Sequence, residues 1–225
     1  MVKLVLFDID GTLIRSGGAG VKAFGRAMET IFKIPNATAG VSFAGRTDTG
    51  LVRELFLRHR IPHTEENCRE FFECYVFWLD RLLNELDGRP CPGAFEMVED
   101  FQRLPLPPRL GLLTGNIRLG AEIKMRYFGL WDYFVTGAFG DDHEDRNQLA
   151  VVAQKRGNEL LERELTGDQI LVIGDTPADV KCAQAINARC LAVATGGSTV
   201  EELKQHQPTW AVPDLQRVRA WEICG

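Results

Sequence analysis

The chain has 225 residues, of which 45% are hydrophobic and 25% charged, a composition that excludes an intrinsically disordered or fibrous protein. Its formal net charge of −5 argues against a nucleic-acid partner, and no apolar run is long enough for a membrane span or a signal peptide. The six cysteines form no Cys-x-x-Cys pair, which disfavours a zinc site and is typical of free thiols in a reducing compartment. We therefore expect a cytoplasmic globular protein, monomer or homodimer, that binds neither nucleic acid nor membrane.

The first predicted element is a buried strand that ends in two carboxylates. Residues 2–7 form a nearly unbroken apolar run, as expected for a strand covered on both faces. Asp8 and Asp10 follow directly, and Gly11 comes next. Two neighbouring carboxylates repel each other and resist desolvation, so a divalent cation at the strand end would make the arrangement favourable. The alternative is a strand that runs into an ordinary Asp-Gly turn.

Residues 16–90 are predicted to form an all-helical insertion. Apolar residues recur at spacings of three and four from about residue 21, a second helix can be capped by Thr47 or Asp48, and a long third helix begins after Thr64. Glycines and prolines at 88–92 end this pattern. We therefore predict a helical cap at 16–90, inserted into a core made of 1–15 and 91–225.

The remainder of the chain alternates between strands and helices. Such alternation predicts a doubly wound α/β fold with a mostly parallel, Rossmann-like sheet. A capping box, Ser198-x-x-Glu201, is expected to begin one of the last helices. Apolar runs mark the further strands at 110–113, 133–136, 170–173 and 190–194, with a possible short edge strand at 210–212.

Polar side chains follow three of these strands at their carboxyl ends. Besides the first carboxylate pair, Thr114 and Asn116 follow the second strand, and Asp175 and Asp179 follow the fourth. In an open α/β sheet these strand ends line one ligand crevice. The acidic cluster suggests a hard cation such as Mg²⁺, and Thr114 at the start of a helix suggests an adjacent anion such as phosphate. A carboxylate aimed at phosphorus there could form an aspartyl-phosphate.

In these motifs and their order, the chain resembles the haloacid dehalogenase-like hydrolases over essentially its whole length. Asp8-Ile9-Asp10-Gly11-Thr12 is similar to the family's first motif, Thr114-Gly115-Asn116 to its second and Gly174-Asp175-x-x-x-Asp179 to its fourth. The helical insertion resembles the family's small cap, which opens and closes over the active site. The branch that the chain resembles is that of the phosphoglycolate phosphatases.

The resemblance implies a role for each motif residue. Asp8 would be the nucleophile, and Asp10 would protonate the leaving oxygen and then activate water. Mg²⁺ would be held by the carboxylates of Asp8 and Asp175 and by the main-chain carbonyl of Asp10, with Asp179 supporting the metal indirectly. The groups implied to hold the substrate's phosphoryl oxygens are the Gly11 amide and the second-motif residues Thr114, Gly115 and Asn116.

The third motif of the family departs from its usual form here. The family normally supplies a lysine ahead of the fourth strand, whereas the matching place holds Arg146. Arginine keeps the positive charge but presents a planar fork, and we favour Arg146 over Lys155, which lies further into the same predicted helix. The acidic run at 141–145 is interpreted as a solvated loop, with a second metal site as the alternative.

The second aspartate of the first motif favours phosphate-ester chemistry, because the true dehalogenases and the phosphonate-cleaving branch lack it. The prediction is a Mg²⁺-dependent phosphatase for a small phosphorylated metabolite, with Arg46 of the cap either contacting the substrate or simply exposed at a helix start. A sugar phosphomutase uses the same pair of aspartates and remains the main alternative. A non-catalytic phosphometabolite-binding protein is the third hypothesis, because a fold alone does not decide function.

Overall fold

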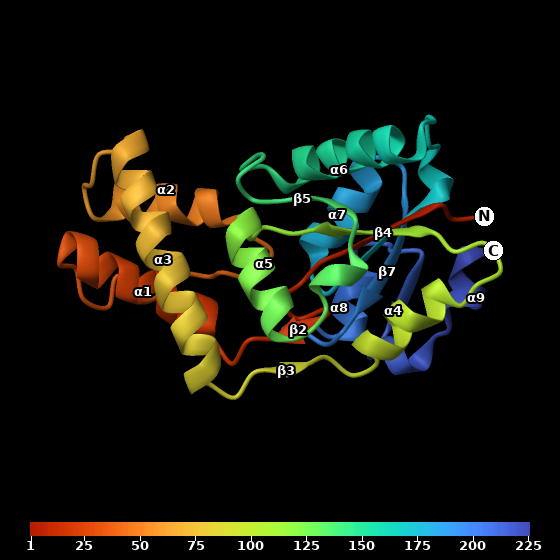
Figure 1. Cartoon of the computed structure of the whole chain (residues 1–225), viewed down its shortest axis with the longest axis horizontal. Helices are drawn as coiled ribbons and strands as arrows, with labels where there is room; N and C mark the ends of the chain where they lie inside the picture. Colours follow the sequence, from red (N-terminus) through yellow and green to blue (C-terminus); the bar gives the residue numbers. More distant parts are fainter.

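The computed structural model describes all 225 residues. The larger part of the molecule is built around a six-stranded parallel sheet (Figure 1). The strand order β5-β4-β1-β6-β7-β8 places β1 at the centre, with the chain extending first to one side of it and then to the other. This arrangement confirms the predicted doubly wound α/β fold. The strands are β1 (Leu4–Phe7), β4 (Arg109–Leu113), β5 (Thr136–Ala138), β6 (Ile170–Gly174), β7 (Arg189–Val193) and β8 (Trp210–Val212).

Alternate residues of β1 point into two separate hydrophobic cores, one on each face of the sheet. Val5 and Phe7 pack in a cluster with α4, α5 and α9, whereas Leu4 and Leu6 pack with α6, α7 and α8. Burial on both faces explains why this strand appears in the sequence as an unbroken apolar run. The helices of this part are α4 (Ala94–Gln102), α5 (Arg118–Tyr127), α6 (Arg146–Leu161), α7 (Pro177–Ala185), α8 (Val200–Lys204) and α9 (Ala220–Cys224).

Three helices form a second, smaller part, seen at the left of Figure 1. They are α1 (Ala19–Phe32), α2 (Asp48–Arg58) and α3 (Glu65–Glu85), and they share a third hydrophobic cluster rich in aromatic rings. The chain passes between the two parts through β2 (Ile14–Arg15) and β3 (Arg89–Pro90), which pair antiparallel. We propose residues 16–90 as the cap unit on this basis. No helix of the chain has both the length and the apolar character needed to cross a membrane.

The third predicted strand is displaced along the sequence. Residues 131–133 form a short 3₁₀ helix, and the strand is β5, where Gly111 of β4 pairs with Thr136 and Leu113 pairs with Ala138. The side chains of Tyr133 and Phe134 pack against the first core from outside the strand. Pairing with β4 therefore determines this edge strand, and the apolar run that precedes it does not.

Candidate active site

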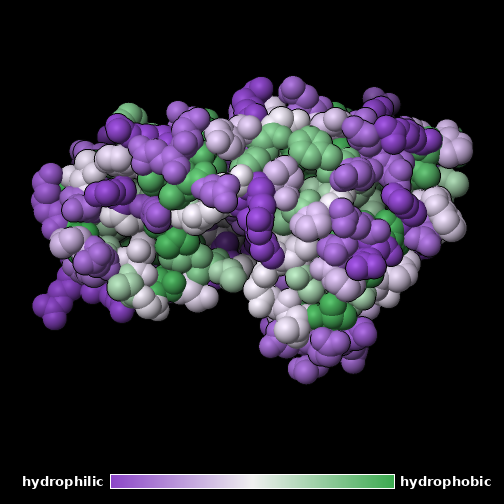
Figure 2. Space-filling view, turned by 90° about the horizontal axis from the view of Figure 1, so that it is seen from below, coloured by the Kyte–Doolittle hydropathy of each residue, from purple (hydrophilic) through white to green (hydrophobic).

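A cleft of about 470 Å³ lies between the carboxyl ends of the sheet strands and the helical cap. Figure 2 shows the surface hollowed where the two parts of the molecule meet. The cleft is the region in which the predicted motifs meet, because β1, β4 and β6 are neighbours and end at the same edge. The predicted site residues that line it are Asp8, Asp10, Gly11, Arg46, Thr114, Gly115, Asn116, Arg146 and Asp175.

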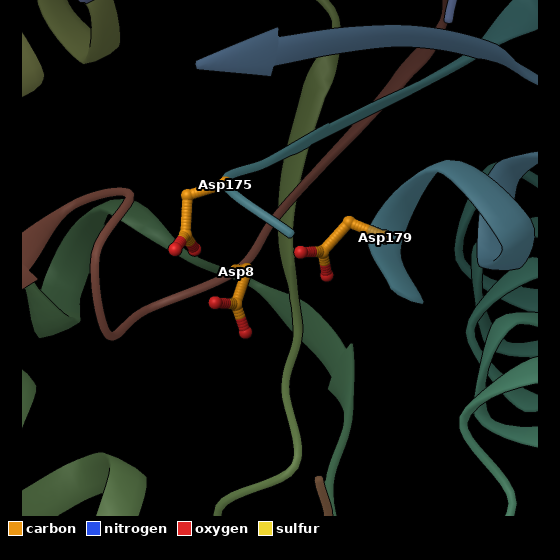
Figure 3. A group of neighbouring side chains, drawn as sticks. All are labelled: Asp8, Asp175 and Asp179. Carbon is orange, nitrogen blue, oxygen red and sulfur yellow. The ribbon is translucent and has the colours of Figure 1, made fainter. Parts of the chain in front are cut away.

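Three buried carboxylates converge at the base of this cleft (Figure 3). Asp8 follows β1, Asp175 follows β6, and Asp179 lies in the first turn of α7. One carboxylate oxygen of each lies within 4.8 Å of the others, and the three residues are 6%, 3% and 1% exposed. The sequence positions are thus brought together as the motifs predicted, although Asp179 is too deep to line the cleft itself.

Burial and mutual repulsion make the carboxylates of Asp8 and Asp175 hard to ionise without a cation. Desolvation, followed by the charge of Asp179, raises the pKa of Asp8 from 3.8 to about 7. Desolvation, followed by the charge of Asp8, raises the pKa of Asp175 to about 9. A buried, all-oxygen, acidic donor set of this kind fits a hard divalent cation such as Mg²⁺, whose charge would favour the ionised carboxylates.

Two glycines leave the space that the Asp175 carboxylate occupies. Gly11 has a φ of +90°, which only glycine adopts readily, and a Cβ there would lie within 3.0 Å of all three carboxyl atoms of Asp175. A Cβ on Gly196, after β7, would overlap the same carboxylate. Thr12 Oγ1 donates a hydrogen bond of 3.1 Å to Asp175 Oδ1. The Gly11 amide donates to Ile14 O, so its predicted contact with phosphate would require that hydrogen bond to open.

Arg146 supplies the positive charge beside the three carboxylates. Its Nη2 donates to Asp179 Oδ1 and lies 3.4 Å from Asp8 Oδ1. Burial alone would lower the pKa of Arg146, but the charges of Asp179 and Asp8 raise it above its ordinary value, so the guanidinium stays ionised. Lys155 is exposed further along α6 and does not line the cleft. Of the two candidates for the third-motif cation, only Arg146 is placed at the site.

Arg146→Met is expected to lower the free energy of unfolding by about 3 kcal/mol, because it leaves buried carboxylates without their cation. Arg146→Lys should lose less, since it keeps the charge without the fork. Lys155→Met on the same helix is the matched control and should change stability by less than about 0.5 kcal/mol. Urea unfolding in the presence of a chelator measures all three. Equal losses for Arg146→Met and Lys155→Met would contradict the assignment.

A second polar network occupies the cleft wall beside the carboxylates. Asn116 Nδ2 donates to Thr114 Oγ1 and to Asp10 Oδ2, both at 2.8 Å. Lys124 of α5 donates to Asp10 Oδ2 at 2.6 Å and to Asn116 Oδ1 at 2.7 Å. The Asp10 carboxylate therefore faces this network and is not part of the three-carboxylate group.

Lys124 was missed by sequence reasoning, although a signal for it exists. On α5 the buried side of the helix carries Ala121 and Met125, and Lys124 falls on the same stripe. A lysine within an apolar stripe either extends to solvent or has a buried partner. Here the partners are two residues of the first and second motifs.

The start of α2 attaches the cap to the core beside the second motif. The Asp48 amide donates to Gly115 O at 2.7 Å, and Asp48 Oδ2 accepts from the Ile117 amide at 2.9 Å. A Cβ on Gly115 would overlap the main chain of Arg46, so this close approach requires glycine. Arg46 is among the residues that line the cleft, and its guanidinium pairs with Glu54. Arg46 is therefore partly buried, and its charge is already paired with a carboxylate.

The acidic run at 141–145 is held by arginines and main-chain groups. Asp142 pairs with Arg156 at 2.6 Å, and Glu144 pairs with Arg53 of the cap at 2.8 Å. Asp145 caps α6. These contacts agree with a structured loop and leave the second-metal interpretation without support.

Comparisons with known proteins agree on the type of protein. A family model described as haloacid dehalogenase-like hydrolase matches residues 2–187. A candidate pyrophosphatase, PpaX, from Clostridium perfringens is 23% identical, with 94% of this chain and 93% of that protein covered. A phosphoglycolate phosphatase from Pseudomonas savastanoi is 23% identical, with coverage of 96% and 78%. The crystal structure of a hydrolase from Pseudomonas syringae has a TM-score of 0.70 at 23% identity, with coverage of 96% and 95%.

Proposed function

Because the chain belongs to the haloacid dehalogenase-like hydrolases, we propose that it is a Mg²⁺-dependent phosphatase that hydrolyses a small phosphomonoester through an aspartyl-phosphate. The observation that carries this proposal is the convergence of Asp8, Asp175 and Asp179 at the base of a cleft. Similarity to a phosphoglycolate phosphatase supports phosphoric monoester hydrolysis, and a small phosphorylated metabolite is the proposed substrate.

In the first half-reaction, Asp8 attacks phosphorus and the bond between phosphorus and the ester oxygen breaks. The leaving oxygen keeps the electron pair and takes a proton from Asp10. In the second half-reaction, water gives a proton to Asp10 while its oxygen attacks phosphorus, and the bond between phosphorus and the Asp8 oxygen breaks. This step releases inorganic phosphate and restores the Asp8 carboxylate.

Positive charge and hydrogen-bond donors around the transferring group would carry much of the rate enhancement. Arg146 lies 3.4 Å from Asp8, which supports a role in stabilising phosphoryl oxygens as well as in orienting the nucleophile. The Thr114 hydroxyl accepts hydrogen bonds from Asn116, which leaves its own proton available for phosphate. Asp8 and Asp175, with the Asp10 carbonyl and Asp179 in support, would hold Mg²⁺, which would add charge stabilisation for the phosphoryl oxygens.

The cap has the position required to cover the substrate and exclude water from the first half-reaction. Its contribution to the cleft wall includes Phe24, Arg46, Leu51 and Tyr75. We also propose a cytoplasmic location, which the six free thiols support.

Product analysis tests this proposal directly. The protein is incubated with Mg²⁺ and a panel of phosphorylated metabolites, including phosphoglycolate and a hexose phosphate, with 4-nitrophenyl phosphate as a general substrate. Release of inorganic phosphate is the expected result. Formation of an isomeric hexose phosphate in place of free phosphate would establish a phosphomutase. Binding of metabolites without turnover of any substrate would indicate a non-catalytic protein.

A further inference from the structure

Lys124 is a buried cation that the steps above do not use. Its side chain is 4% exposed, it comes from the core helix α5, and its ammonium reaches the cleft wall beside Asp10. Burying an ammonium group is costly unless it is paired and hydrogen-bonded. An apolar side chain on this stripe of α5 would avoid that cost, so packing alone does not explain a lysine here.

The contacts of Lys124 determine the orientation of its neighbours. A lysine ammonium only donates hydrogen bonds, so the atom of Asn116 that faces it at 2.7 Å must be the amide oxygen. The amide nitrogen of Asn116 is then directed at Asp10 Oδ2, 2.8 Å away. Lys124 therefore sets the orientation of the Asn116 side chain as well as contacting Asp10.

The two oxygens of Asp10 have different surroundings as a result. Oδ2 accepts from Lys124 at 2.6 Å and from Asn116 at 2.8 Å, and both partners are donors. A proton on Oδ2 would face two other hydrogen atoms. Oδ1 has only the Ser16 hydroxyl at 3.5 Å, which is a long contact. The oxygen that can carry a proton without losing a partner is Oδ1.

We propose that Lys124 is the positioning residue for the general acid and base of this enzyme. By holding Asp10 Oδ2, it directs Oδ1 to deliver the proton to the leaving oxygen and later to accept the proton of water. This inference rests on the proposed phosphatase function, because it assigns Asp10 the role described above. Lys124 acts through Asp10 and needs no contact with the substrate.

Dependence on the leaving group separates this role from a general loss of structure. An alkyl phosphate such as phosphoglycolate requires protonation of its leaving oxygen, whereas the phenolate of 4-nitrophenyl phosphate leaves without a proton. The parameter kcat/KM reports steps up to the first irreversible one, which includes departure of the leaving group. Lys124→Met is expected to lower kcat/KM for the alkyl phosphate by about 30- to 100-fold, a part of what general acid catalysis contributes. The value for 4-nitrophenyl phosphate should fall by less than about 3-fold.

Controls come from the same helix and from Asp10 itself. Arg126 lies on α5, is exposed and pairs with Glu122, so Arg126→Met should leave both values unchanged. Asp10→Asn should show the same selective loss for the alkyl phosphate. In the Asp10→Asn background, adding Lys124→Met should change the alkyl rate by less than about 2-fold, because the two residues act as one unit. Lys124→Gln is the second variant if Lys124→Met folds poorly, since the ratio of the two rates is independent of the folded fraction.

Several outcomes would overturn the inference. Equal losses for both substrates in Lys124→Met and Lys124→Gln would assign Lys124 a structural role. A rise in KM with unchanged kcat for both substrates would assign it to substrate binding. A full additional loss in the Asp10→Asn background would show that it acts independently of Asp10. Failure of the underlying phosphatase proposal would look different, because the unmodified protein would then release no phosphate from either substrate.

Discussion

Asp8→Asn is expected to lower turnover by about 10⁴-fold or more while the protein stays folded, because an amide cannot serve as the nucleophile. Asp8 lies at the end of β1 with a carboxylate oxygen within 4.8 Å of those of Asp175 and Asp179. The pKa of Asp8 is raised to about 7, chiefly by burial and then by the charge of Asp179. Ionisation of Asp8 therefore destabilises the metal-free folded protein. Removing that charge should leave the metal-free variant at least as stable as the wild type at neutral pH and above.

The measurement combines phosphate release with thermal unfolding of the same preparation. Asp132→Asn is the matched control, because the Asp132 side chain is 93% exposed and should tolerate the change without effect. Mass spectrometry excludes deamidation of the introduced asparagine, which would restore an aspartate and produce activity that rises with storage. Wild-type turnover in an undeamidated Asp8→Asn protein would remove the nucleophile assignment.

The fold and the main site could be predicted because each rests on a local signal. Apolar runs mark strands covered on both faces, and polar residues directly after them meet at one edge of a parallel sheet. Asp8, Thr114 and Asp175 are far apart in sequence, yet each needs only its own strand to be placed. The known geometry of a doubly wound sheet then brings them together.

Features that depend on a tertiary partner could not be predicted in the same way. The edge strand β5 begins at Thr136 because it pairs with β4, although the stronger apolar run precedes it. A one-residue shift also affects α8, which is capped by Thr199 and Glu202, one position after the predicted capping box. The sequence contains a signal for the strand and for the capping box at more than one position. Packing and hydrogen bonding in the folded protein determine which position is used.

Buried polar residues of the cleft wall carry the weakest sequence signal. The sequence indicates Asp48 only as a possible helix cap, but it is buried, and its carboxylate accepts a hydrogen bond from the core at Ile117. Burial raises the pKa of Asp48 to about 7. Lys124 gave no motif signal, because its partners Asp10 and Asn116 belong to other segments of the chain. A polar residue on an apolar helix stripe indicates a buried partner without identifying it.

Removal of Mg²⁺ is expected to stop turnover completely, and its return should restore activity. The same ion should stabilise the folded protein, and the stabilisation should grow with pH.

In the metal-free protein the pKa values of Asp8 and Asp175 are raised from 3.8 to about 7 and about 9, by burial first and then by neighbouring carboxylates. A carboxyl group whose pKa is higher in the folded state than in the unfolded chain stabilises the folded state. This contribution is complete at pH values below the pKa of the unfolded chain and is lost as the pH rises through the pKa of the folded state. The metal-free protein should therefore lose stability between about pH 4 and pH 9.

Mg²⁺ opposes this loss, because it favours the ionised carboxylates and binds in competition with protons. The difference in Tm between Mg²⁺-loaded and chelator-treated protein should be small at about pH 5 and several degrees larger at about pH 8. Thermal unfolding across this range, with and without Mg²⁺, measures the effect independently of activity. Asp175→Asn, which removes a proposed ligand, should lose most of the Mg²⁺-dependent shift. A Mg²⁺ effect that is equal at both pH values, or that persists in Asp175→Asn, would place the ion elsewhere.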